Sequence, residues 1–78
     1  MPTILREGPY RFFFYSGDSV ESPHVHVRRD KFTAKFWLSP VILSRSGRFS
    51  RQEINQIQRL VEENQETFLG EWNEYFGS

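Results

Sequence analysis

The stretch that decides the fold is HVHVRRDKFTAKFWL, residues 24–38. Apolar and polar side chains alternate over residues 24–28 and again over residues 32–38, as expected for strands with one buried face. Asp30 and Lys31 lie between the two runs and suit a tight turn. The stretch is therefore predicted to form an antiparallel hairpin.

Shorter strands are predicted on both sides of this hairpin. Residues 10–15 (YRFFFY) follow Gly8-Pro9 and are rich in strand-forming aromatics, whereas residues 16–22 have the composition of a loop. Residues 3–6 are expected to form an edge strand, and residues 41–43 a further short strand after Pro40. The prediction is a small antiparallel sheet of four to five short strands within residues 3–43.

One long C-terminal helix is predicted over about residues 50–76. Ser50 and Glu53 have the spacing of a capping box, which marks a helix start. Gly70 costs about 1 kcal/mol relative to alanine in a helix, so the helix can kink or split there. Such an amphipathic helix normally packs across a sheet, which makes the expected fold class α+β. Its apolar stripe recurs at three- and four-residue intervals and consists of Ile54, Ile57, Leu60, Val61, Phe68, Trp72, Tyr75 and Phe76.

Length and composition narrow the class of protein. A chain of 78 residues can fill one core, so residues 1–78 are expected to form a single domain. The absence of cysteine excludes a disulfide framework, a thiolate zinc site and a cysteine nucleophile. Small domains without disulfides are usually intracellular, and no apolar stretch approaches the roughly 20 residues of a membrane helix. We therefore expect a cytoplasmic protein with no membrane partner.

The most informative side chains are two histidines, His24 and His26. Residues two apart on a strand share a face, so both imidazoles should project on the same side as Arg28. Lys35 and Trp37 are expected on that side from the second strand of the hairpin. Such an exposed face would suit a phosphate or RNA ligand, because histidine transfers protons near neutral pH, cations hold anionic oxygens and tryptophan stacks on bases.

Three interpretations of the histidine pair are open at this stage. The imidazoles could bind a metal ion if Asp18 or Glu21 completed the site from the loop. They could act without a metal as the acid and base of a ribonuclease-like site, with Arg28, Lys35 and Trp37 binding the RNA. They could also hydrogen-bond to neighbouring backbone or present a binding surface. No resident cofactor is expected from the sequence.

Several stretches of the chain resemble the short bacterial proteins grouped as domain of unknown function 4160. The most specific are Pro-His-x-His-Val at residues 23–27 and Lys-Phe-Trp at residues 35–37. One departure lies in the hairpin, where Asp30-Lys31-Phe32 stands in place of the family's glycine. The matching stretches are MPTIL (1–5), GPYRFFFY (8–15), PHVHV (23–27), AKFWL (34–38), SRSG (44–47) and WNEYF (72–76).

The resemblance implies a small bacterial protein with a small protein partner encoded nearby, in an arrangement like a toxin–antitoxin pair. It implies no catalytic residues. The first functional hypothesis is therefore a protein-interaction module, one component of such a two-protein system. The alternative is an RNA-cleaving toxin, with or without a metal, that uses His24 and His26. A third hypothesis is a nucleic-acid-binding domain without chemistry.

Overall fold

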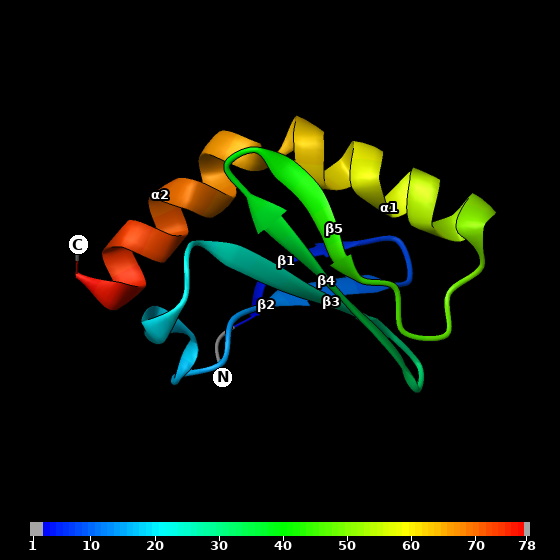
Figure 1. Cartoon of the computed structure of the whole chain (residues 1–78), viewed down its shortest axis with the longest axis horizontal. Helices are drawn as coiled ribbons and strands as arrows, with labels where there is room; N and C mark the ends of the chain where they lie inside the picture. Colours follow the sequence, from blue (N-terminus) through cyan, green and yellow to red (C-terminus); the bar gives the residue numbers. More distant parts are fainter. Residues whose placement is uncertain (1–2, 78) are drawn as a thin grey trace.

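The computed structural model describes residues 3–77 and has a five-stranded antiparallel sheet with two helices over one face (Figure 1). The strand order is β1-β2-β3-β4-β5, so each strand pairs with its neighbour along the chain. This confirms the predicted α+β class and the antiparallel sheet. The strands are β1 (Thr3–Glu7), β2 (Tyr10–Phe13), β3 (His24–Arg29), β4 (Phe32–Leu38) and β5 (Val41–Arg45).

The predicted hairpin is the centre of the sheet. β3 and β4 pair in an unbroken register from His24 opposite Trp37 to Arg29 opposite Phe32. Asp30 takes a φ of 56° in the turn, in the left-handed region that favours glycine. Aspartate is among the non-glycine residues that tolerate this region, so the turn forms without the family's glycine.

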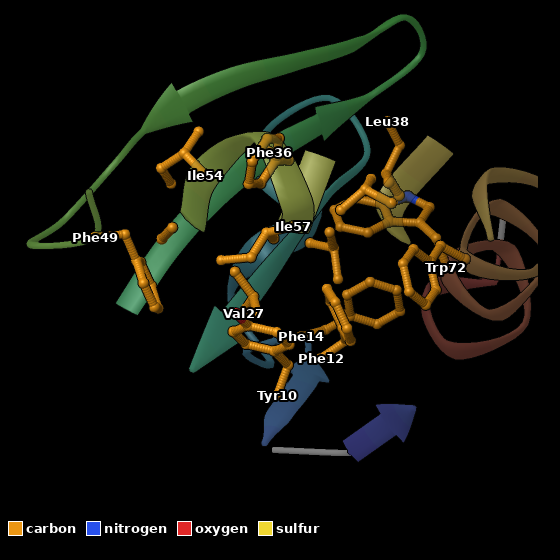
Figure 2. Close-up of a cluster of buried hydrophobic side chains, with 14 residues drawn as sticks. Tyr10, Phe12, Phe14, Val27, Phe36, Leu38, Phe49, Ile54, Ile57 and Trp72 are labelled. Carbon is orange, nitrogen blue, oxygen red and sulfur yellow. The ribbon is translucent and has the colours of Figure 1, made fainter. Parts of the chain in front are cut away.

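The core lies between the sheet and the helices. Val25, Val27 and Phe36 on the central strands are fully buried against it, and Ile57 and Trp72 reach them from the helices (Figure 2). Two aromatic contacts extend the core towards the second helix, from Phe12 to Phe68 and from Phe14 to Trp72, each with ring centroids 5.3 Å apart. The aromatic residues therefore supply much of the volume that a short chain must bury.

The C-terminal helical region is two helices, α1 (Arg51–Glu63) and α2 (Gln65–Phe76), so the prediction of one long helix is wrong. The break lies at Asn64 and not at Gly70. The Asn64 side chain donates a hydrogen bond to the Leu60 carbonyl at 2.8 Å, and Gln65 reaches across to the Leu38 carbonyl at 2.6 Å. An asparagine that bonds to nearby backbone competes with helix continuation, and the Gln65 contact depends on the tertiary fold.

The start of α1 is the predicted one. Ser50 is the N-cap, and its Oγ accepts a hydrogen bond from the Glu53 backbone N–H at 3.1 Å. The Glu53 carboxylate binds the sheet, where it accepts hydrogen bonds from the Arg29 guanidinium at 2.5 and 2.9 Å and from the Tyr10 hydroxyl at 2.8 Å. These charge-assisted bonds fix the first turn of α1 to β2 and β3.

The loop between β2 and β3 positions the candidate site. β2 ends at Phe13, two residues earlier than predicted, and the chain then turns through a short 3-10 helix, η1 (Asp18–Val20). Asp18 closes the turn, because its backbone N–H bonds to the Tyr15 carbonyl at 3.0 Å and its carboxylate accepts the Tyr15 N–H at 2.8 Å. Within residues 3–77, neither helix is long and apolar enough to cross a bilayer.

Candidate functional site

Three ionisable side chains meet beside the start of β3, on the side of that strand opposite Val25 and Val27. His24 and His26 project there from β3, and Asp18 approaches them from the loop. The Nε2 atom of His24 lies 3.2 Å from Oδ1 of Asp18, and Nε2 of His26 lies 3.1 Å from Oδ2 of the same carboxylate. One carboxylate therefore bridges two imidazoles.

The two imidazoles are buried, which corrects the expectation of an exposed catalytic face. His24 is 1% exposed and His26 is 8% exposed, whereas Val25 and Val27 are buried on the opposite face as predicted. His24 contacts the rings of Trp37 and Trp72, with centroids 5.5 and 5.2 Å away. The predicted alternation was correct, but it describes only the strand and not the aromatic rings and loop that cover it.

Aromatic rings also enclose His26. Phe13 stacks on the imidazole with ring centroids 5.5 Å apart, and Tyr15 meets it edge-on at 4.6 Å. Burial lowers the pKa of His26, while the Asp18 carboxylate acts in the opposite direction. His26 is consequently disposed to be neutral and can donate its Nε2 proton to Asp18.

The hydrogen bond of His24 to the backbone determines which of its nitrogens carries a proton. Its Nδ1 lies 2.8 Å from the Ser22 carbonyl oxygen, which can only accept, so Nδ1 must donate. In a neutral ring Nε2 then carries a lone pair, and this lone pair faces the Asp18 carboxylate. Within the described chain, His24 Nε2 is a buried polar atom without a hydrogen-bond partner.

A second carboxylate near His24 is already paired. Glu21 lies 3.8 Å from Nδ1 of His24, but it accepts a hydrogen bond from Lys35 Nζ at 2.6 Å. This bond with Lys35 lowers the pKa of Glu21. Lys35 Nζ also lies 4.5 Å from the centre of the Trp37 ring. Of the two candidate carboxylates, Asp18 is therefore the one that faces both imidazoles.

The structure brings most, but not all, of the predicted site residues together. Lys35 and Trp37 lie beside the histidines, although Lys35 is buried and Trp37 only half-exposed. Arg28 lies near the other end of β3, where its Nε donates to the Asp30 carbonyl at 2.8 Å. Arg28 is thus associated with the hairpin turn and not with the Asp18–His24–His26 cluster.

Two residues outside the predicted histidine site, Tyr15 and Arg45, share a small hollow with His26 and Lys35. The hollow has a volume of about 170 Å³, and Thr33 and Ala34 complete its lining. Arg45 reaches it because it pairs with Lys35 across β4 and β5, after an irregularity in the register. Alternation within one strand carries no information about such cross-strand neighbours, so it could not place Arg45 beside Lys35 and His26.

The chemistry available to the cluster follows from its donor atoms. Asp18, His24 and His26 each offer one ligand atom, and these atoms lie within 4.8 Å of one another. One carboxylate and two imidazoles are a common ligand set for zinc and related metals. Without a metal, the same groups form a buried hydrogen-bonded cluster, with only His26 bordering the hollow.

Comparison with known proteins supports the resemblance seen in the sequence. The family model described as "Domain of unknown function (DUF4160)" matches residues 10–73, which include the whole cluster, β5 and most of both helices. No curated protein and no solved structure matches the chain. Because the family model covers well over half of the sequence, this chain belongs to the DUF4160 family.

Proposed function

We propose that this chain is a bacterial cytoplasmic protein-interaction module, one component of a toxin–antitoxin-like pair, and that it binds its partner protein along β5. The observation that carries the proposal is the position of β5 at the edge of the sheet within residues 3–77, where Ile42 is 52% exposed. An intracellular location is supported by the absence of cysteine from the sequence. A small partner encoded nearby is what the family resemblance implies.

The apolar surface beside this edge supports strand addition. Ile42 pairs with Trp37 across β4 and β5, and both residues line a hollow of about 220 Å³ together with Pro23 and Pro40. A partner strand could pair with the outer edge of β5 while its side chains fill the apolar hollow. Exposed edge strands with apolar side chains are ready sites for pairing with another chain.

The opposite edge of the sheet is less suited to this role. β1 pairs with β2 through a register irregularity between Thr3 and Leu5, and it carries the charged residues Arg6 and Glu7. Bulges and charges are features that discourage edge-to-edge pairing. β5 has its irregularity and its one charged residue, Arg45, at its C-terminal end, and its first three residues are the apolar Val41, Ile42 and Leu43.

The test compares two exposed aliphatic residues in a titration of this chain with the protein encoded beside its gene. Ile42→Lys should weaken binding by at least about tenfold, since an apolar interface anchor commonly contributes 1–2 kcal/mol or more. Val20→Lys is the matched control, because Val20 is 89% exposed in η1 and does not line the hollow beside Ile42, so it should leave the affinity unchanged.

Amide hydrogen exchange then tests the binding mode. Partner binding should slow exchange in residues 41–45, as expected when a new strand pairs with β5. Equal affinity of the wild type and Ile42→Lys, without added protection in β5, would contradict the proposal. Growth arrest on inducing this gene alone, rescued by its neighbour, would identify this chain as the toxin component.

A second candidate function is RNA cleavage, which the hollow beside His26 supports. His26, Lys35, Arg45 and Tyr15 together offer a proton-transfer group, two cations and a hydroxyl in a space large enough for a phosphate group. The buried His24 would then support the site through Asp18 or as a metal ligand. Cleavage of short RNA that is lost in His26→Ala and retained in Ile42→Lys would favour this candidate. Binding without cleavage would favour the nucleic-acid-binding hypothesis.

A further inference from the structure

We propose that Asp18, His24 and His26 form a site for one divalent transition-metal ion of the zinc class. This inference goes beyond the proposed partner binding and does not depend on it, because the three ligands lie outside β5. It rests on the convergence of the ligand atoms, on the orientation of His24 and on the burial of its unpaired nitrogen.

The separations between ligand atoms fit a small metal ion. Zinc bonds of about 2.0–2.1 Å in tetrahedral geometry place neighbouring ligand atoms about 3.3 Å apart. The carboxylate of Asp18 already lies 3.2 Å from Nε2 of His24 and 3.1 Å from Nε2 of His26. The full set of ligand atoms lies within 4.8 Å, so a modest rotation of a ring or of the carboxylate would complete the site.

The orientation of His24 is the one that metal-binding histidines usually adopt. Such histidines donate the proton of one ring nitrogen to a carbonyl or carboxylate, which leaves the other nitrogen free to bind the metal. His24 Nδ1 meets the Ser22 carbonyl at 2.8 Å, and its Nε2 is directed towards Asp18. The hydrogen bond that orients a metal-binding histidine is therefore already present in His24, between Nδ1 and the Ser22 carbonyl.

The burial of His24 makes a cation between these groups favourable. Nε2 of the buried His24 lies 3.2 Å from the Asp18 carboxylate, yet it has no hydrogen-bond partner within the described residues. Unpaired polar atoms in a buried site are costly. A metal ion would bind Nε2 of His24 and balance the carboxylate charge at the same time.

The donor set selects the class of metal. Imidazole nitrogens favour zinc, nickel, copper and cobalt, whereas magnesium and calcium prefer sites made only of oxygen ligands. With three protein ligands, a fourth position is left for water or a substrate atom. His26 also borders the hollow with Tyr15, Lys35 and Arg45, so an exchangeable ligand has a polar approach to the site.

The test is a titration of the full, untagged and metal-free chain with Zn²⁺, followed by calorimetry and by ¹H–¹⁵N spectra of the imidazoles. The chain contains only two histidines and no cysteine, so competing sites for zinc are few. We expect one equivalent to bind and to shift Nε2 of both histidines. Co²⁺ should give the absorption bands of a low-coordinate site.

Matched variants separate this site from non-specific binding. Asp18→Asn and His26→Gln should each weaken zinc binding by at least about 100-fold, because even residues that only orient a ligand contribute about 10- to 100-fold. Glu21→Gln should bind zinc as the wild type does, since Glu21 is paired with Lys35. Each variant's fold is checked by its amide spectrum, and Asp18→Asn keeps the size of the side chain.

Two results would overturn the proposal. One is the absence of binding at stoichiometric Zn²⁺ and Co²⁺, or equal binding by the wild type, Asp18→Asn and His26→Gln. The other is a proton that stays on Nε2 of His24 after one equivalent of zinc, which would show that a proton and not a metal bridges to Asp18. Neither result bears on partner binding at β5, which the Ile42→Lys experiment tests separately.

Discussion

Oδ2 of Asp18 lies 3.1 Å from Nε2 of His26, although eight positions separate the two residues. The same oxygen accepts the Tyr15 backbone N–H at 2.8 Å. A single carboxylate thus closes the turn of the β2–β3 loop and holds that loop over the histidines of β3. The stability of the loop and the environment of the histidines are therefore coupled through Asp18.

The first prediction concerns this coupling in the metal-free protein. Asp18→Ala should lower the free energy of unfolding by about 1.5–3 kcal/mol, the range for losing hydrogen bonds to a charged group. Ser19→Ala in the same turn is exposed and should change it by no more than about 0.5 kcal/mol. Urea denaturation in the presence of a chelator measures both. Equal stability of the two variants would show that Asp18 does not hold the loop.

The second prediction concerns pH and the Glu53 carboxylate. The hydrogen bond from Arg29 lowers the pKa of Glu53 below its ordinary value of 4.5, and the Tyr10 hydroxyl adds to this effect, while burial opposes it. A group with a lowered pKa contributes stability above the pKa of the unfolded chain and loses it as the pH falls through its folded pKa. The wild type should therefore be more stable than Glu53→Gln at pH 7, and this difference should shrink as the pH falls below about 4.5.

The measurement is a series of urea denaturation curves between pH 7 and pH 3 for both proteins. Glu71→Gln is the control, because Glu71 is exposed on α2, far along the chain from the Arg29 pair. The free energy of unfolding of Glu71→Gln should differ little from that of the wild type at every pH. A difference for Glu53→Gln that does not change with pH would mean that the ion pair does not contribute to stability.

The third prediction concerns a close approach of two backbone segments. Gly47 has a φ of +60°, and a Cβ atom placed on it would lie 2.1 Å from the Thr33 carbonyl oxygen. Gly47→Ala should destabilise the protein by at least about 1–3 kcal/mol, because the left-handed backbone and the steric clash act together. Gly17→Ala should be nearly neutral, since Gly17 has a φ of −88° and open space around it. Thermal unfolding of the two variants decides the point.

The sequence predicted those parts of the fold that depend on local patterns. The alternation across His24–Arg28 and Phe32–Leu38 indicated the central hairpin, and the Ser50–Glu53 spacing indicated the start of α1. The partners of Glu53 could not be predicted, because Arg29 and Tyr10 become its neighbours only after the helix packs on the sheet.

The candidate site was predictable in its residues but not in its environment. His24 and His26 were identified from the strand pattern, and Asp18 or Glu21 was named as the carboxylate that the adjoining loop would add. Their burial was not, because it depends on how the loop folds back and on Trp37 and Trp72, which contact His24 from different elements. A side chain's exposure depends on long-range packing, which periodicity within one strand does not contain.

The fourth prediction follows from the position of the helix break. The low helix propensity of glycine suggested a break at Gly70, yet α2 runs without interruption from Gln65 to Phe76, and Gly70 is exposed with open space around it. Gly70→Ala should therefore stabilise the protein by about 0.4–1 kcal/mol, because alanine fits a helical backbone and restricts the unfolded chain.

Gly77→Ala is the matched opposite case. Gly77 ends α2 with a φ of +71°, where a side chain costs about 1–2 kcal/mol, so this variant should not be stabilised. Thermal unfolding with far-ultraviolet circular dichroism compares both variants with the wild type. A loss of stability in Gly70→Ala would contradict the prediction and would indicate that the protein needs a glycine at this position.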